Sequence, residues 1–111
     1  MLPLLVLSAA LLTAQLAWWT SAPIRADSPK TNNIVDFEFE PAIFTVPAGA
    51  TVVWTNLGPT PHDVASADLT WSSEMLMTGG TYSYTFNVPG TYQIYCTLHP
   101  TMLGSITVTP S

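Results

Sequence analysis

Four side chains of this 111-residue chain form a set that could bind a soft metal ion. Cys96 is the only cysteine, His99 follows it at a spacing of three, and Met102 follows His99 at the same spacing. The fourth residue, His62, lies upstream after a proline-rich segment. Thiolate and thioether sulfur favour Cu(I), and imidazole also binds Cu(II). Two histidines, one cysteine and one methionine are the ligands of a blue-copper electron-transfer site, which the sequence therefore predicts.

Each of these residues also has an ordinary structural explanation, and other chemistry competes for the set. A single cysteine is commonly a small buried hydrophobe, a methionine before a last strand commonly fills the core, and a lone histidine is commonly on the surface. Structural zinc sites use two or more cysteines and normally no methionine. A Cys-His nucleophile would need a group that orients His99, and none is evident. We therefore expect no enzyme.

Apolar and polar residues alternate over much of the chain after residue 33, which is the pattern of half-buried strands. Glycine and proline separate these runs, and no run has a helical period. The fold class is therefore all-β, a sandwich or barrel of about seven to eight strands. The predicted strands cover residues 34–40, 43–46, 51–56, 62–66, 81–86, 91–96 and 104–109.

The phase of two strands places two of the candidate ligands. His62 is in phase with Val64, and Cys96 is in phase with Tyr92 and Ile94. If these apolar faces point into the core, both ligands point inward, each at one end of its strand. For the two ligands to meet, the strand that ends at Cys96 must lie near the one that begins at His62.

The charge of the chain excludes some partners. Residues 27–111 carry seven acidic side chains and one basic side chain, so their formal charge is 1 − 7 = −6. We expect such a domain to avoid nucleic acid and anionic lipid and to be attracted to basic surfaces, although the charge also simply favours solubility. In strand 34–40, Val35, Phe37 and Phe39 are predicted to face inward and to alternate with a solvated face of Asp36, Glu38 and Glu40.

The N-terminal region is predicted to lie outside the folded domain. Residues 1–26 are apolar and end in small residues near Ala26, which is typical of a signal peptide, although no basic residue precedes the apolar run. An uncleaved membrane anchor is the alternative. We expect a linker at 27–33, a domain at 34–111, and an exported protein that acts in the periplasm or outside the cell. So small a core is helped by a bound metal, since one cysteine forms no internal disulfide.

The motifs around the candidate ligands resemble those of the cupredoxins, the small blue copper proteins of the plastocyanin and amicyanin group. The ligand loop resembles that of amicyanin in particular, and the similarity extends over residues 34–109. It is carried by the patterns Phe39-x-Pro41, Val46-x-x-Gly49-x-Thr51-Val52-x-Trp54-x-Asn56, Pro61-His62-x-Val64 and Cys96-x-x-His99-x-x-Met102.

The resemblance implies a Greek-key fold, one type 1 copper ion, and transfer of single electrons between redox proteins. His62, Cys96 and His99 would be the trigonal ligands, and Met102 the weak axial one. Partners would be proteins such as a c-type cytochrome, a dehydrogenase or an oxidase, and the protein itself would be a monomer. They would dock near His99 on a patch of exposed apolar residues: Leu57, Pro59, Leu98, Pro100 and Leu103.

The chain departs from the family pattern immediately after the first ligand histidine. Asp63 stands where the family often has an asparagine that ties the two ligand loops together. An aspartate can accept the same hydrogen bonds, but it adds a negative charge that would favour Cu(II) and lower the potential. Two other functions stay open from the sequence: copper delivery without redox turnover, and a metal-free interaction domain.

Overall fold

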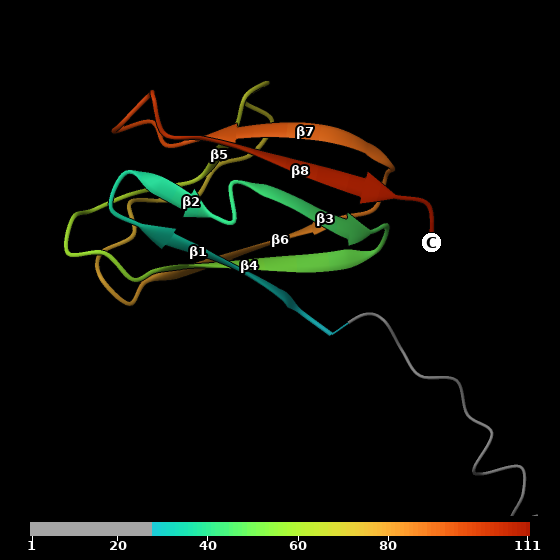
Figure 1. Cartoon of the computed structure of the whole chain (residues 1–111), viewed down its shortest axis with the longest axis horizontal. Coiled ribbons are helices and arrows are strands. Elements are labelled where there is room, and N and C mark those ends of the chain that lie inside the picture. Colours follow the sequence, from blue (N-terminus) through green and yellow to red (C-terminus); the bar gives the residue numbers. More distant parts are fainter. Residues whose placement is uncertain (1–27) are drawn as a thin grey trace, which may run out of the picture.

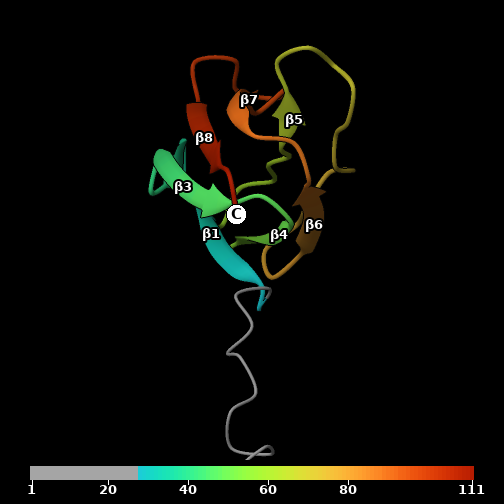
Figure 2. The same ribbon diagram turned by 90° about the vertical axis from the view of Figure 1, so that its right-hand side faces the viewer.

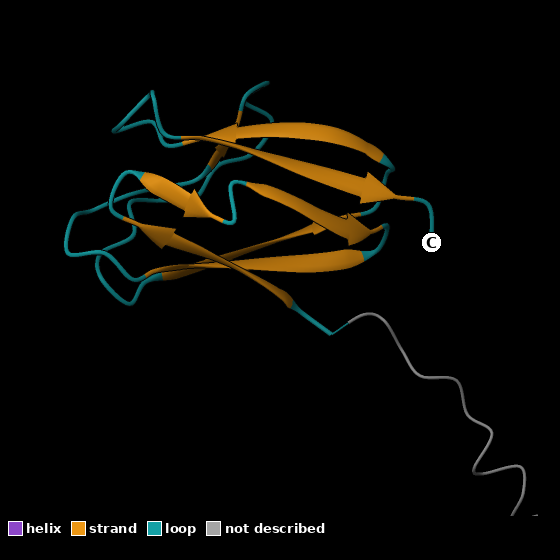
Figure 3. Cartoon of the chain, viewed as in Figure 1, coloured by secondary structure: helices purple, strands orange, loops and turns teal. Residues whose placement is uncertain are grey.

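The computed structural model describes residues 28–111, which form a sandwich of two four-stranded sheets (Figure 1). One sheet has the strand order β2-β1-β4-β6 and the other β3-β8-β7-β5, and Figure 2 shows them as two layers. The predicted all-β fold class is confirmed, because the described residues contain strands and loops and no helix (Figure 3). The strands are β1 (Lys30–Val35), β2 (Glu38–Glu40), β3 (Ile43–Pro47), β4 (Ala50–Asn56), β5 (Ala65–Ser66), β6 (Thr81–Phe86), β7 (Gly90–Tyr95) and β8 (Leu103–Thr109).

Both sheets mix parallel and antiparallel pairs. Strand β1 runs parallel to β4, and β3 runs parallel to β8, while the remaining pairs are antiparallel. Five predicted strands match β3, β4, β6, β7 and β8 with shifts of no more than one residue at each end. Their alternation is clearest in β4, where Val52 and Trp54 are fully buried and the residues between them are partly exposed.

The core between the sheets contains a group of stacked aromatic side chains. Trp71 lies against Tyr84 with ring centroids 4.4 Å apart and planes inclined by 20°. Trp54, which is fully buried, stacks on Tyr82 at 6.1 Å and meets Phe86 edge-on. These five residues are the aromatic cluster, and they join β4 and β6 to the long connection after β5.

The prediction of one continuous strand over residues 34–40 is wrong. β1 and β2 form a hairpin in which Val35 pairs with Glu38, so Asp36 and Phe37 are its two-residue turn. Phe37 has a φ of 64°, which is unusual for a bulky side chain, and it is 57% exposed rather than inward-facing. β1 also begins at Lys30, inside the segment predicted as a linker, because its backbone pairs with β4.

The prediction for residues 62–66 is only partly confirmed. Regular strand is limited to β5, and His62 instead forms an isolated bridge with Leu76. All five residues of the segment are buried, so the expected alternation of exposure is absent. The reason is that residues 71–76 cover the outer side of the segment, with Ser73 N–H donating to the Val64 carbonyl at 2.8 Å.

The predicted signal peptide or anchor at residues 1–26 lies outside the described residues. Within residues 28–111 we find no helix with the length and apolar character of a membrane span.

Candidate metal centre

Three segments that are far apart in sequence meet at one end of the sandwich, away from the C-terminus (Figure 1). They are the β1–β2 turn at 36–37, the segment 57–63 after β4, and the loop 96–102 between β7 and β8. This is the ligand end of the molecule. Pairing of β5 with β7, in which Ala65 lies opposite Tyr95, brings His62 close to Cys96. Both side chains are fully buried, which confirms the prediction that they point inward.

The loop from Cys96 to Met102 is closed by its own backbone. Cys96 N–H donates to the Met102 carbonyl at 3.1 Å, and Met102 N–H donates to the His99 carbonyl at 2.8 Å. His99 N–H in turn donates to the Cys96 carbonyl at 3.3 Å. These bonds hold the three predicted ligands of the loop in a compact turn. His99 is half-buried, whereas Met102 is 2% exposed and belongs to the core.

Three ligand atoms converge at this end. One atom each from His62, Cys96 and His99 lies within 4.8 Å of the other two. Cys96 Sγ is 3.9 Å from His62 Nδ1 and 3.7 Å from His99 Nδ1. Metal–sulfur and metal–nitrogen bonds of about 2.3 and 2.0 Å, set about 120° apart, would separate sulfur from nitrogen by about 3.7 Å. The donor set therefore has the chemistry and the spacing for a trigonal metal site.

Asp63 ties the two ligand segments together. Its carboxylate accepts a hydrogen bond of 2.7 Å from the Thr97 backbone N–H and another from the Thr97 hydroxyl. Asp63 N–H points at Cys96 Sγ, with a nitrogen–sulfur distance of 3.5 Å. The carboxylate thus takes over the bridging role that the resemblance assigns to asparagine at this position.

Asp36, predicted to lie on the solvated face of strand 34–40, instead reaches His62 at the ligand end. Its Oδ1 lies 3.1 Å from His62 Nε2, and its Oδ2 accepts a hydrogen bond of 3.1 Å from the Thr60 hydroxyl. The hydrogen bond with His62, together with the bonds from Thr60, lowers the pKa of Asp36 below its ordinary value, although desolvation opposes this. The two-residue turn, which the alternation pattern concealed, is what directs this side chain to His62.

Phe37, the other residue of the turn, is exposed beside the two histidines rather than inward-facing as predicted. Its ring meets His99 edge-on at a centroid distance of 5.0 Å and His62 at 6.0 Å. It adds an exposed aromatic side chain to the apolar surface around His99. The five residues predicted to form that surface are all exposed: Leu57, Pro59, Leu98, Pro100 and Leu103.

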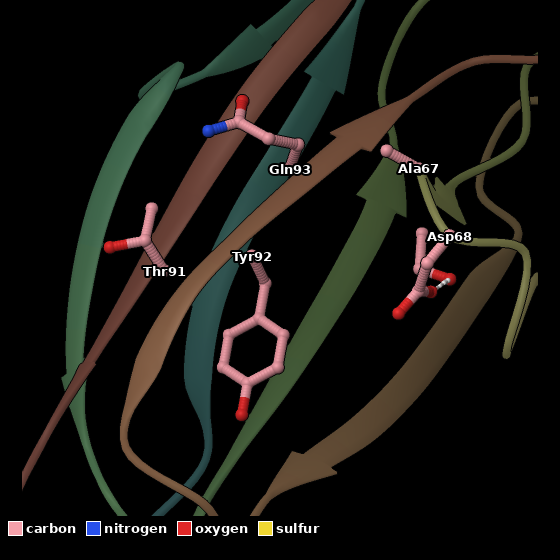
Figure 4. A pocket seen from close by; sticks show the side chains of 6 residues that line it. Ala67, Asp68, Thr91, Tyr92 and Gln93 are labelled. Atoms are coloured by element: carbon pink, nitrogen blue, oxygen red, sulfur yellow. Dashed lines mark hydrogen bonds between the residues drawn. The ribbon is translucent and has the colours of Figure 1, made fainter.

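A shallow pocket of about 210 Å³ lies elsewhere, along β5 and β7. Figure 4 shows its lining, which includes Asp68, Tyr92 and Gln93. None of the four predicted ligands lines it, so this pocket plays no part in the metal centre.

Comparison with known proteins agrees with this geometry. Residues 7–108 match the family described as the Cupredoxin-like domain. Amicyanin-alpha of Methylorubrum extorquens is 36% identical over 80 residues, which cover 68% of this chain and 67% of that protein.

Two solved structures illustrate the likeness of the fold. A purple cupredoxin from Nitrosopumilus maritimus superposes with a TM-score of 0.69 at 29% identity, covering 72% of this chain and 99% of that one. An amicyanin variant in its Cu(I) form superposes with a TM-score of 0.68 at 32% identity, covering 76% of this chain and 85% of that one. With the family match over nearly the whole chain and three ligand atoms at the expected end of the sandwich, this protein belongs to the cupredoxin-like family.

Proposed function

We propose that this protein carries single electrons between redox proteins through one type 1 copper ion bound by His62, Cys96 and His99. Met102 would supply a fourth, weaker thioether ligand. The observation that carries the proposal is the convergence of the three ligand atoms within 4.8 Å, with sulfur–nitrogen distances of 3.7 and 3.9 Å. Bound copper supplies one-electron chemistry by alternating between Cu(I) and Cu(II).

The chain's own contribution is a site that changes little between the two oxidation states. His62 and Cys96 are fully buried and lie on neighbouring segments beside the paired strands β5 and β7. Asp63 joins those segments through both Thr97 donors, and the loop 96–102 is closed by its backbone hydrogen bonds. Ligands supported by such contacts keep their positions, which keeps the reorganisation on electron transfer small.

His99 is the route by which electrons leave and enter. It is the one predicted ligand of the four that is not fully enclosed, being half-buried at the ligand end. Phe37, which is exposed, meets the ring of His99 edge-on, and Leu98 and Leu103, at and just after the same loop, are exposed as well. A small apolar surface of this kind suits weak, short-lived docking. The surplus of acidic residues favours a partner whose docking face is rimmed by basic residues.

We further propose that the protein acts after export, in the periplasm or outside the cell. The apolar residues 1–26 support this, because they have the length and the small C-terminal residues of a signal peptide. Mass spectrometry of the protein recovered from its native host would test this proposal. A mature chain that begins near residue 27, recovered from the periplasm or the medium, is expected. An intact N-terminus would favour the uncleaved anchor instead, and recovery only from the cytoplasm would contradict export.

The visible absorption spectrum of the copper-loaded protein tests the central proposal. We expect an intense band from the thiolate–Cu(II) pair that ascorbate bleaches, and we expect Cys96→Ser to abolish it. Thr97→Ser is the matched control, because it alters the neighbouring residue and keeps a hydroxyl for Asp63. A colourless wild-type protein after Cu(II) loading would overturn the proposal.

A further inference from the structure

Asp36 contacts the predicted copper ligand His62 at Nε2, from a different part of the chain. It lies in the β1–β2 turn, and its side chain is 32% exposed. Its Oδ1 is 3.1 Å from Nε2 of His62, whose own side chain is fully buried. The opposite ring nitrogen, Nδ1, is the one that lies 3.9 Å from Cys96 Sγ. The carboxylate and the proposed metal position therefore lie on opposite sides of one imidazole ring.

The chemistry of the two groups fixes where the proton sits. An ionised carboxylate only accepts hydrogen bonds, so a short contact with Nε2 requires a proton on Nε2. In the neutral ring that leaves a free lone pair on Nδ1, directed towards Cys96. A carboxylate on the outer nitrogen also makes the ligating nitrogen more basic.

A glycine makes room for this contact. A Cβ atom added at Gly58 would lie 2.6 Å from Asp36 Oδ1 and 3.1 Å from the Asp36 backbone nitrogen. Gly58 cannot easily move away, because its N–H donates to Asn56 Oδ1 at 2.9 Å and its carbonyl accepts from the Thr78 hydroxyl at 2.6 Å. The close approach of Asp36 thus depends on the absence of a side chain at position 58.

We propose that Asp36 is a positioning residue of the metal centre, which holds His62 in the Nε2–H tautomer and strengthens its Nδ1 as a ligand for Cu(II). This inference rests on the proposed copper site. Because Cu(II) carries more charge than Cu(I), a nearby anion and a more basic imidazole stabilise the oxidised state more. Asp36 therefore lowers the redox potential of the site.

The first test needs no metal. Nitrogen NMR of the metal-free, full-length protein at about pH 8, above the ordinary histidine pKa of about 6.5, reports the tautomer of His62. We expect the Nε2–H form in the wild type and a mixture of the two forms in Asp36→Ala. Gly58→Ala keeps the carboxylate in the chain but displaces it, so it should give the same mixture. An unchanged tautomer in both variants would overturn the proposal.

The second test measures the copper-loaded protein. We expect Asp36→Asn to weaken Cu(II) binding about tenfold more than Cu(I) binding, which raises the one-electron potential by ~59 mV. Glu38→Gln is the matched control. Glu38 lies two residues after Asp36, its side chain is exposed, and the substitution removes the same negative charge. Equal potentials for Asp36→Asn and Glu38→Gln would show a general charge effect and refute the specific role. A wild-type protein with no blue colour would instead refute the copper site itself, and the metal-free measurement would still stand.

Discussion

The aromatic cluster and the ligand end are held together by different kinds of contact. In the aromatic cluster, the side chains of Trp54 and Trp71 pack against Tyr82, Tyr84 and Phe86 through contacts between rings. At the ligand end the side chains are joined by directed hydrogen bonds, in which Asp63 accepts from Thr97 and Asp36 accepts from His62 and Thr60.

This difference separates what stabilises the fold from what determines the site. Contacts between stacked rings contribute free energy of folding in proportion to buried area. Hydrogen bonds at the ligand end contribute less net stability each, but they fix positions and charges next to the ligands. Substitutions in the aromatic cluster should therefore lower stability most and leave the copper spectrum unchanged. Substitutions at the ligand end should lower stability less and change the properties of the bound metal.

Trp54→Ala is expected to have the largest effect on stability. Trp54 is fully buried between the sheets, so its truncation should lower the free energy of unfolding by about 3–5 kcal/mol. Denaturant unfolding of the metal-free protein measures this loss. The copper spectrum of the folded variant should keep its wild-type band position. A shifted band would mean that the aromatic cluster also sets ligand geometry, which would break the comparison.

Substitutions of Asp63 are expected to lower stability less than Trp54→Ala, and alanine and asparagine should have different effects. Asp63→Ala leaves the Thr97 N–H and hydroxyl without their acceptor and should cost about 1–3 kcal/mol. Asp63→Asn should cost less than about 1 kcal/mol, because its amide oxygen accepts from the N–H and its amide nitrogen donates to the hydroxyl. The Asn variant should still raise the potential, since it removes a negative charge beside Cys96.

Denaturant unfolding and voltammetry of the two Asp63 variants separate the bridging role from the charge. The same potential in wild type and Asp63→Asn would contradict the role of the charge. Equal stability of the wild type and Asp63→Ala would contradict the role of the bridge.

Phe37 tests whether the ligand end is built for docking rather than for stability. Its positive φ costs on the order of 1 kcal/mol in a non-glycine residue. Phe37→Asn fits this backbone better, so the stability should change by less than about 1 kcal/mol. The loss of the ring that meets His99 should slow electron self-exchange, which NMR line broadening measures. An unchanged rate would show that the ring takes no part in contact between molecules.

The sequence predicted the body of the fold more accurately than the ligand end. Alternation identified β4 and β6 because a strand with one buried face has a period of two. The candidate metal ligands were predicted from residue type and spacing, and the structure brings together ligand atoms of three of them, His62, Cys96 and His99. The turn at 36–37 was missed because the apolar residues at 35, 37 and 39 continue a false alternation. Ile34 and Phe39 pair across the turn and both face the core, an odd spacing that a continuous strand does not allow.

The contact between Asp36 and His62 could not be predicted from the sequence for a similar reason. Its contact with His62 depends on the direction of the hairpin turn and on the space at Gly58, and neither leaves a periodic signal. A lowered pKa does not by itself identify a carboxylate that belongs to the metal centre. Asp68, near the pocket along β5 and β7, has a lowered pKa as well, and its neighbours are ordinary hydroxyl groups.

Asp68 therefore supplies the smallest expected effect and a control for the ligand end. Hydrogen bonds from Ser66 and then Thr70 lower its pKa, so the folded state favours the ionised form. The stability it adds is fully present above its unfolded pKa of about 3.9 and is lost as the pH falls through the lower folded value. The stability difference between wild type and Asp68→Asn should thus be constant at neutral pH and shrink below about pH 4. Urea unfolding across this range measures it. The copper spectrum should not change, and a change would mean that surface carboxylates far from the ligand end influence the metal.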